Sequence, residues 1–212
     1  MRLWRVMTIV GLVAGSTLAG GCSESEPPAP PVQAAPPADP STLGVVSGQV
    51  PGAAPGSIAT LLPSVAQPLP PPASTPTLDQ VQLQFNPDML VARAGFPVAF
   101  HSSDPELHNI NVRKSDKRQA EFNRSIPPGG SFDHVFAEPG FYDVRCDIHP
   151  AMTAAIFVAA SPFAESLDPT GVFVFQDVPP GTYTLTVYNG AATLEKRIEV
   201  IRGENTVTLD GV

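Results

Sequence analysis

The chain has 212 residues, 26 prolines, two cysteines and a formal net charge of −8. Two of its 12 basic residues and none of its 20 acidic residues lie before residue 22, so the chain from residue 22 onward has a charge of −10. Such an acidic surface argues against nucleic acid as a partner. The length allows two small hydrophobic cores.

The N-terminal residues form a predicted secretory signal. Arg2 and Arg5 precede an apolar run that extends from about Val6 to Leu18, and small residues follow it. This run is too short for a membrane-spanning helix. We therefore expect residues 1–21 to be a signal peptide and the protein to be exported.

A lipid anchor is the more specific expectation for this end of the chain. The stretch LAGGC at 18–22 resembles a bacterial lipobox, in which the signal is cut before the cysteine and that cysteine is lipidated. The resemblance implies a periplasmic or cell-envelope lipoprotein tethered to a membrane through Cys22, and plain secretion is the alternative. With Cys22 at the N-terminus, Cys146 is the only other thiol, so no internal disulfide can form.

Two proline-rich segments divide the chain. Residues 22–43 contain mostly proline, alanine, serine and acidic residues, which predicts a disordered tether. A second break runs from Pro63 to Pro76. Between them, Val45–Val50 and Ile58–Leu62 are predicted to be short strands separated by a glycine-rich turn.

From Leu78 onward, apolar residues recur with a period of two. Val81, Leu83 and Phe85 alternate with glutamines, and the segments before residue 160 have turn residues between them. The last fifty residues repeat this pattern, and no amphipathic helix is evident. Short strands separated by turns predict an all-β chain with antiparallel sandwiches or barrels.

Three metal-ligand side chains follow one predicted strand. Cys146, His149 and Met152 are spaced three residues apart on a loop. A soft thiolate with imidazole selects copper, and two histidines with one cysteine and a weak axial methionine form the blue-copper ligand set. Zinc is the alternative metal, but it prefers four strong tetrahedral ligands, and a thioether is a weak one.

The second histidine must come from elsewhere in the chain. His108 is the best candidate, because it begins an alternation with Ile110 and Val112 and so shares the inward face of their strand. His101 is expected to be structural or exposed to solvent. His134 is the second choice for the ligand.

These motifs resemble the cupredoxin family. Residues 77–160 look like a Greek-key cupredoxin sandwich, the loop has the amicyanin spacing, and the pair after Leu107 matches the family's His-Asn. The resemblance implies that His108, Cys146 and His149 form a plane around one type 1 copper ion, with Met152 above it. It also implies that the exposed edge of His149 is the exit for the electron. The family usually has an asparagine a few residues before the upstream histidine, which joins the ligand loops, and Ser102 stands there.

A basic cluster follows the predicted His108 strand. In this acidic chain it is either a solvated loop or a docking surface for an acidic redox partner. Its members are Arg113, Lys114, Lys117, Arg118 and Arg124.

The C-terminal part resembles a different family. The segments 168–175 and 178–185 are similar to the carboxypeptidase regulatory-like domain, a small transthyretin-like β-sandwich. In that family two earlier strands precede this motif. We therefore expect residues 44–72 and 161–212 to form one sandwich into which the cupredoxin domain, 77–160, is inserted. The alternative is a simple tandem order.

The leading functional hypothesis is an exported one-electron carrier that is not an enzyme. Its partner would be a redox protein such as a dehydrogenase or an oxidase. The alternative is a periplasmic copper-binding protein that buffers or delivers copper without electron turnover.

Overall fold

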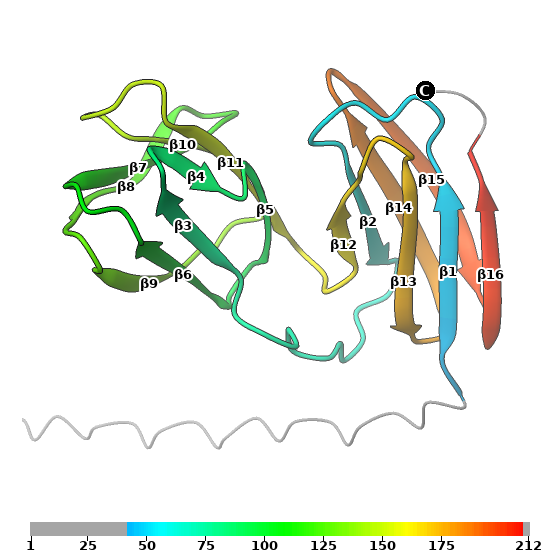
Figure 1. Ribbon diagram of the computed structural model, residues 1–212. Coiled ribbons are helices and arrows are strands. Elements are labelled where there is room, and N and C mark those ends of the chain that lie inside the picture. The colour runs from blue at the N-terminus through cyan, green and yellow to red at the C-terminus, as the bar shows by residue number, and fades with distance from the viewer. Residues whose placement is uncertain (1–41, 210–212) are drawn as a thin grey trace, which may run out of the picture. The chain divides into compact units, whose positions relative to one another are not determined.

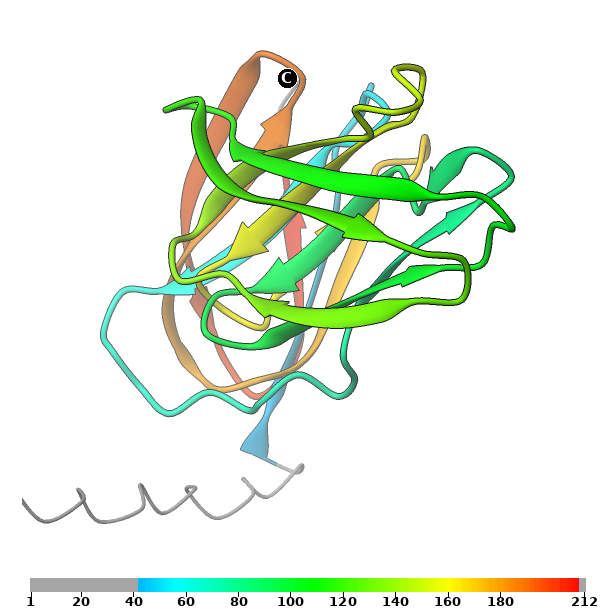
Figure 2. The same cartoon turned by 90° about the vertical axis from the view of Figure 1, so that its left-hand side faces the viewer.

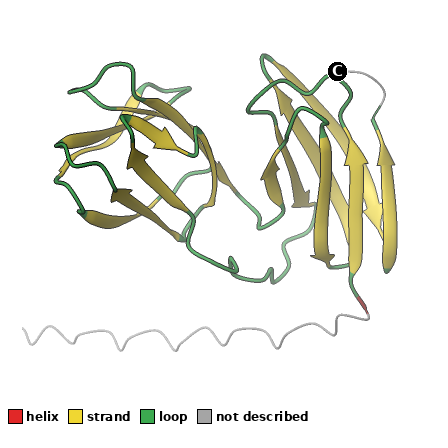
Figure 3. Ribbon diagram, in the orientation of Figure 1, coloured by secondary structure: helices red, strands yellow, loops and turns green. Residues whose placement is uncertain are grey.

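The structure is a computed structural model that describes residues 42–209. The expected signal peptide, Cys22 and nearly all of the tether lie outside these residues. The described chain is all-β, as predicted, and forms 16 strands joined by loops (Figure 3). No helix in this part of the chain is long and apolar enough to cross a membrane.

The first sandwich consists of two sheets from the middle of the chain. Its five-stranded sheet has the order β5-β11-β10-β7-β8 and its four-stranded sheet the order β4-β3-β6-β9. The strands are β3 (Thr77–Val81), β4 (Gln84–Asn86), β5 (Met89–Arg93), β6 (Pro97–Ser102), β7 (His108–Lys114), β8 (Gln119–Ile126), β9 (Ser131–Val135), β10 (Gly140–Arg145) and β11 (Thr153–Ala159). Figure 2 shows them in green to yellow, facing the reader. Their inward residues form one core, which includes Phe100, Tyr142 and Cys146.

The second sandwich contains strands from both sides of the first in sequence. Its sheets have the orders β13-β1-β16 and β12-β2-β14-β15. The strands are β1 (Gly44–Gln49), β2 (Ile58–Pro63), β12 (Ala164–Ser166), β13 (Val172–Val178), β14 (Gly181–Asn189), β15 (Ala192–Val200) and β16 (Gly203–Thr208). Figure 1 shows β1 between β13 and β16. The N-terminal strands β1 and β2 thus pair with strands that follow residue 160, and their core includes Val46, Leu61 and Leu185.

Not all strand pairs are antiparallel, which corrects the simple antiparallel sandwich expected from the sequence. The pairs β3 and β6, β5 and β11, and β1 and β16 are parallel. The chain passes through the opposite sheet between β3 and β6, and such a crossover allows neighbouring strands to run in the same direction.

The apolar alternation at residues 81–85 is a tight hairpin and not one strand. Gln82 and Leu83 have positive φ angles of 54° and 58° and separate β3 from β4. Their backbone N–H groups donate to the two carboxylate oxygens of Asp104, at 2.5 and 2.9 Å. This carboxylate, 21 or more residues away in sequence, stabilises a left-handed turn that glutamine and leucine rarely adopt.

A tyrosine fixes the start of an inner strand in each sandwich. The hydroxyl of Tyr142 donates to the carbonyl of Glu138, and that of Tyr183 donates to the carbonyl of Pro179, both at 2.8 Å. A proline–glycine pair precedes each tyrosine, and Gly140 has a φ of 134° that favours glycine. In the first sandwich this contact fixes the chain where it enters β10, the strand that leads to Cys146.

An apolar cluster joins the outer face of β10 and β11 to the second sandwich. Phe141, Phe157 and Tyr188 are in mutual ring contact, with centroids 4.8 to 5.3 Å apart. Ile58 and Phe157 are buried in this cluster. The contact involves the end of β10 that is farther from Cys146.

Candidate metal centre

Cys146 lies at the mouth of the first sandwich, directly after β10. Its side chain is only 2% exposed and belongs to the core. Its backbone N–H donates to the carbonyl of Met152 at 3.1 Å, and the N–H of Met152 donates to the carbonyl of His149 at 2.9 Å. These bonds fold the loop 146–152 back on itself, so that its three candidate ligands come from one compact turn.

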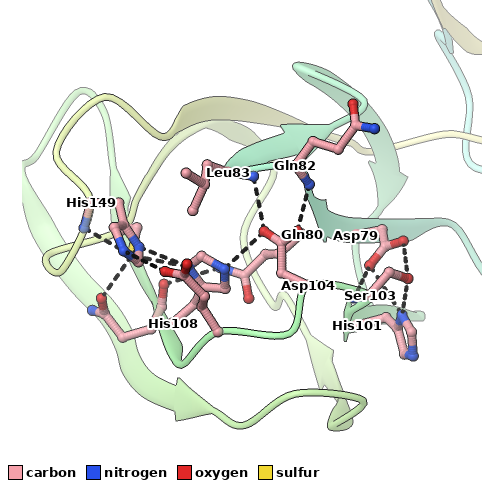
Figure 4. A network of polar contacts seen from close by, with 12 residues as sticks. Asp79, Gln80, Gln82, Leu83, His101, Ser103, Asp104, His108 and His149 are labelled. Atoms are coloured by element: carbon pink, nitrogen blue, oxygen red, sulfur yellow. Dashed lines mark hydrogen bonds and ion pairs between the residues drawn. The ribbon is translucent and has the colours of Figure 1, made fainter.

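His108 meets this loop from the neighbouring strand. It is the first residue of β7, is fully buried, and points toward His149 (Figure 4). The Sγ atom of Cys146 lies 3.9 Å from Nδ1 of His108 and 3.8 Å from Nδ1 of His149, and the two nitrogens are 3.0 Å apart. The three donor atoms therefore face one another.

This triangle has the size that a metal ion requires. An ion about 2.0 Å from each nitrogen and about 2.3 Å from sulfur, in a trigonal plane, would separate nitrogen from sulfur by about 3.7 Å and the nitrogens by about 3.5 Å. The observed nitrogen–sulfur separations of 3.9 and 3.8 Å are close to the first of these values, whereas the two nitrogens, 3.0 Å apart, are closer together than in such a plane. Met152, the fourth predicted ligand, is 1% exposed and belongs to the same buried core as Cys146.

A carboxylate orients His108. Asp104 is 6% exposed, and its Oδ2 atom lies 2.9 Å from Nε2 of His108. Burial raises the pKa of Asp104, but hydrogen bonds from Leu83, Gln82 and His108 outweigh it and leave the pKa below its ordinary value. An ionised carboxylate can only accept a hydrogen bond, so Nε2 of His108 carries the proton and donates to Asp104. The Nδ1 atom then has a lone pair, which is directed toward Cys146.

Asn109 joins the two ligand segments. Its Oδ1 atom accepts the backbone N–H of Asp147 at 2.7 Å and lies 3.4 Å from Sγ of Cys146. Its Nδ2 group donates to the Asp147 carboxylate at 2.8 Å. The joining asparagine is thus the residue after His108. Ser102 does not supply the link, because its buried hydroxyl has no hydrogen-bond partner.

The sulfur of Cys146 also accepts a backbone hydrogen bond. The N–H of His149 lies 3.4 Å from Sγ. Such a bond stabilises negative charge on a thiolate and is one means by which a protein sets the properties of a bound metal.

One ligand reaches the surface. The side chain of His149 is 26% exposed, and its Nε2 atom lies 3.4 Å from the carboxylate of Glu106. Leu107 and Ile148, which directly precede the two histidines, are exposed. The ring edge of His149 is therefore accessible from solvent and has apolar neighbours.

The other two histidines lie away from this cluster. Nδ1 of His101 is 3.0 Å from Asp79 and 3.2 Å from the hydroxyl of Ser103 (Figure 4). Both contacts use one ring nitrogen, so these residues cannot relay a proton as a hydrolytic triad does. His134 contacts Glu121 at 2.8 Å.

The comparison with solved structures gives distant matches, among them those that follow. No family model and no curated protein matches the sequence. Among solved structures, a purple cupredoxin from Nitrosopumilus maritimus is 23% identical over 40% of this chain and 99% of its own, with a TM-score of 0.35. Amicyanin from Paracoccus versutus is 19% identical over 47% of this chain and 98% of its own, with a TM-score of 0.37.

A larger enzyme is also similar in part. The copper-containing nitrite reductase from Thermus scotoductus is 25% identical over 46% of this chain and 25% of its own, with a TM-score of 0.38. All three scores are below 0.5.

Sequence reasoning missed two residues that support the cluster. Asp104 precedes His108 by four residues. The presence of a carboxylate so close in sequence was the one sign that it could be the hydrogen-bond partner of His108. Glu106 lies between them and contacts His149. Both roles depend on the conformation of the loop before β7, which has no periodic pattern.

Proposed function

We propose that this chain is a type 1 copper protein that carries single electrons, with one copper ion held by His108, Cys146, His149 and Met152. The observation that carries the proposal is the triangle of two Nδ1 atoms and one Sγ atom at the mouth of a β-sandwich. A buried methionine in the same core completes the ligand set.

The donor chemistry favours copper. Two imidazoles and one thiolate with a thioether suit both oxidation states of copper, whereas a zinc site usually has four strong ligands. When bound, copper would accept and release one electron. Each of the four proposed ligands has at least one hydrogen bond that holds it in place without the metal.

The residues around the ligands limit the movement that electron transfer requires. Asp104 holds the ring of His108, and Asn109 holds the backbone after Cys146. Ligands that are held in one geometry need little rearrangement when the charge of the ion changes. The exposed edge of His149 is the proposed exit for the electron.

The proposed setting is the cell envelope. A signal peptide, lipidation at Cys22 and a proline-rich tether would hold the sandwiches near a membrane, where a redox protein would dock. Mass spectrometry of the membrane fraction tests the anchor, because an unmodified Cys22 or a cut elsewhere contradicts it. We propose that the second sandwich, which resembles carboxypeptidase regulatory-like domains, is a scaffold or docking module.

Copper reconstitution tests the central proposal. We expect one copper ion per chain and an intense visible absorption from the copper–thiolate bond that bleaches on reduction and returns on oxidation. Cys146→Ser should abolish the absorption. His101→Ala, which removes a histidine outside the cluster, is the matched control and should leave it unchanged.

The same experiment separates electron transfer from copper storage. A colourless copper site that exchanges rapidly with a chelator would favour a buffering or delivery protein and contradict the electron carrier. Two or more tightly bound copper ions per chain would also contradict the proposed site.

A further inference from the structure

We propose that the outer face of the five-stranded sheet binds a small free oxyanion of the phosphate class. An open hollow of about 510 Å³ lies on this face. Three arginines line it, Arg113 from β7, Arg145 from the end of β10, and Arg118 from the turn before β8. The remaining lining residues are Asn111, Asp143 and Asp147.

The three guanidinium groups form no hydrogen bond within the described chain, although the charge of Arg113 acts on the carboxylate of Asp147. None of them makes a hydrogen bond or an ion pair within 4 Å with another residue of 42–209. A guanidinium has five N–H donors and no acceptor, and its planar shape suits the oxygens of phosphate or carboxylate. Three such groups around one hollow therefore leave many donors available to an anion.

The other members of the basic cluster are already engaged. Lys114 and Lys117 bind the carboxylate of Glu138 at 2.6 and 3.0 Å, and the guanidinium of Arg124 stacks on Phe132 at 4.3 Å from the ring centroid. The cluster that the sequence presents as one patch thus divides in two. The arginines of the hollow form no hydrogen bond or close ion pair within the described chain.

The acidic residues of the hollow are also engaged, but with neutral donors. The Asp147 carboxylate accepts hydrogen bonds from the amides of Asn109, Asn111 and Asn123, at 2.8 to 3.2 Å. Asp143 accepts one from the hydroxyl of Ser115 at 3.0 Å. Hydrogen bonds from Asn111, Asn123 and Asn109, and then the charge of Arg113, lower the pKa of Asp147, but no arginine nitrogen lies within 4 Å of either carboxylate. The hollow therefore keeps a formal charge of +1 in a chain whose net charge is −8.

The backbone at Arg118 supports a role for its side chain. Its φ is +50°, in the left-handed region where glycine is favoured and a long side chain is uncommon. The turn would be less strained with glycine there. An arginine at such a position, beside two other unpaired arginines, is better explained by the anion than by the turn.

Titration with inorganic phosphate tests the proposal. We would follow the backbone and arginine Nε–H signals of the full chain by NMR at constant ionic strength, with chloride as the balancing anion. We expect saturable shifts at Arg113, Arg118 and Arg145, in both the metal-free and the copper-loaded protein. Binding to the metal-free protein makes this result independent of the proposed electron-transfer function.

Arg118→Gly separates binding from folding. It removes one guanidinium and relieves the backbone strain, so phosphate affinity should fall about tenfold while the melting temperature stays the same or rises. Arg202→Gln removes an exposed positive charge in the second sandwich and is the matched control. It should leave the affinity unchanged.

Three outcomes would overturn the proposal. The first is equal phosphate affinity in the wild type and Arg118→Gly, and the second is an equal loss in Arg202→Gln. The third is binding of polyglutamate or phosphatidic acid vesicles through these arginines without binding of free phosphate. That outcome would identify the face as a docking surface for an acidic protein or a membrane.

Discussion

Replacing Asp104 with asparagine tests how the protein prepares His108 for a metal. In the wild type, Oδ1 accepts the N–H of Gln82, and Oδ2 accepts the N–H of Leu83 and Nε2 of His108. Asparagine has the same shape but one acceptor oxygen and one NH₂ group. In either orientation of the amide, its NH₂ group faces at least one of these three N–H groups, which then has no acceptor.

The size of the effect follows from those contacts. One buried donor left without an acceptor costs about 1 to 3 kcal/mol, and the remaining bonds lose the contribution of the ionised acceptor. Because Asp104 is 6% exposed, water can replace little of this loss. We expect the free energy of unfolding of the metal-free protein to fall by about 2 to 4 kcal/mol.

Copper affinity should fall as well. The amide no longer favours the His108 tautomer with its proton on Nε2, and loss of such a support typically weakens metal binding about 10- to 100-fold. Urea unfolding measures the first effect, and competition with a copper chelator measures the second. Asp133→Asn makes the same charge change at an exposed position of the same sandwich and is the control. Equal stability and affinity in the two variants would refute this account of Asp104.

Four further changes test the contacts that support the two sandwiches. Asn109→Ala removes the link to the 146–152 loop, and we expect copper affinity to fall about tenfold, measured by chelator competition. Tyr142→Phe should lower the free energy of unfolding by about 1 kcal/mol, and Tyr183→Phe in the second sandwich should do the same without changing the copper absorption. Hydrogen bonds from Lys114 and a second lysine lower the pKa of Glu138 to about 2. A lowered folded-state pKa adds stability above the unfolded-state value of about 4.3 that is lost as the pH falls toward 2. Glu138→Gln should therefore flatten acid unfolding curves over that window, and an unchanged slope would contradict the ion pair.

Most of the candidate cluster could be predicted because its residues are local in sequence. Three of the four residues lie within seven positions on one loop, and the spacing alone indicates soft-metal coordination. His108 was identified from the inward alternation of its strand, and the structure places its donor atom in a triangle with those of Cys146 and His149. Met152 is buried in the same core, as its proposed role requires.

The supports of the site could not be predicted because they depend on contacts between distant segments. The hairpin at Gln82 and Leu83 lies within an apolar alternation that predicts an extended strand. Its left-handed backbone is stabilised by the carboxylate of Asp104, which lies more than 20 residues later. The hairpin and the hydrogen-bond partner of His108 were therefore missed for the same reason, because the carboxylate of Asp104 binds both the hairpin and His108.

The two ends of β10 have different surroundings. Phe141, near its start, contacts Tyr188 of the second sandwich, and Cys146 follows its end. At about 3.3 Å per residue, five residues of strand separate these points by about 16 Å. The second sandwich therefore packs at one end of the strand and leaves the ligand loop at the other end uncovered. The exposed edge of His149 is therefore accessible from solvent without displacement of the second sandwich, as the proposed electron exit requires.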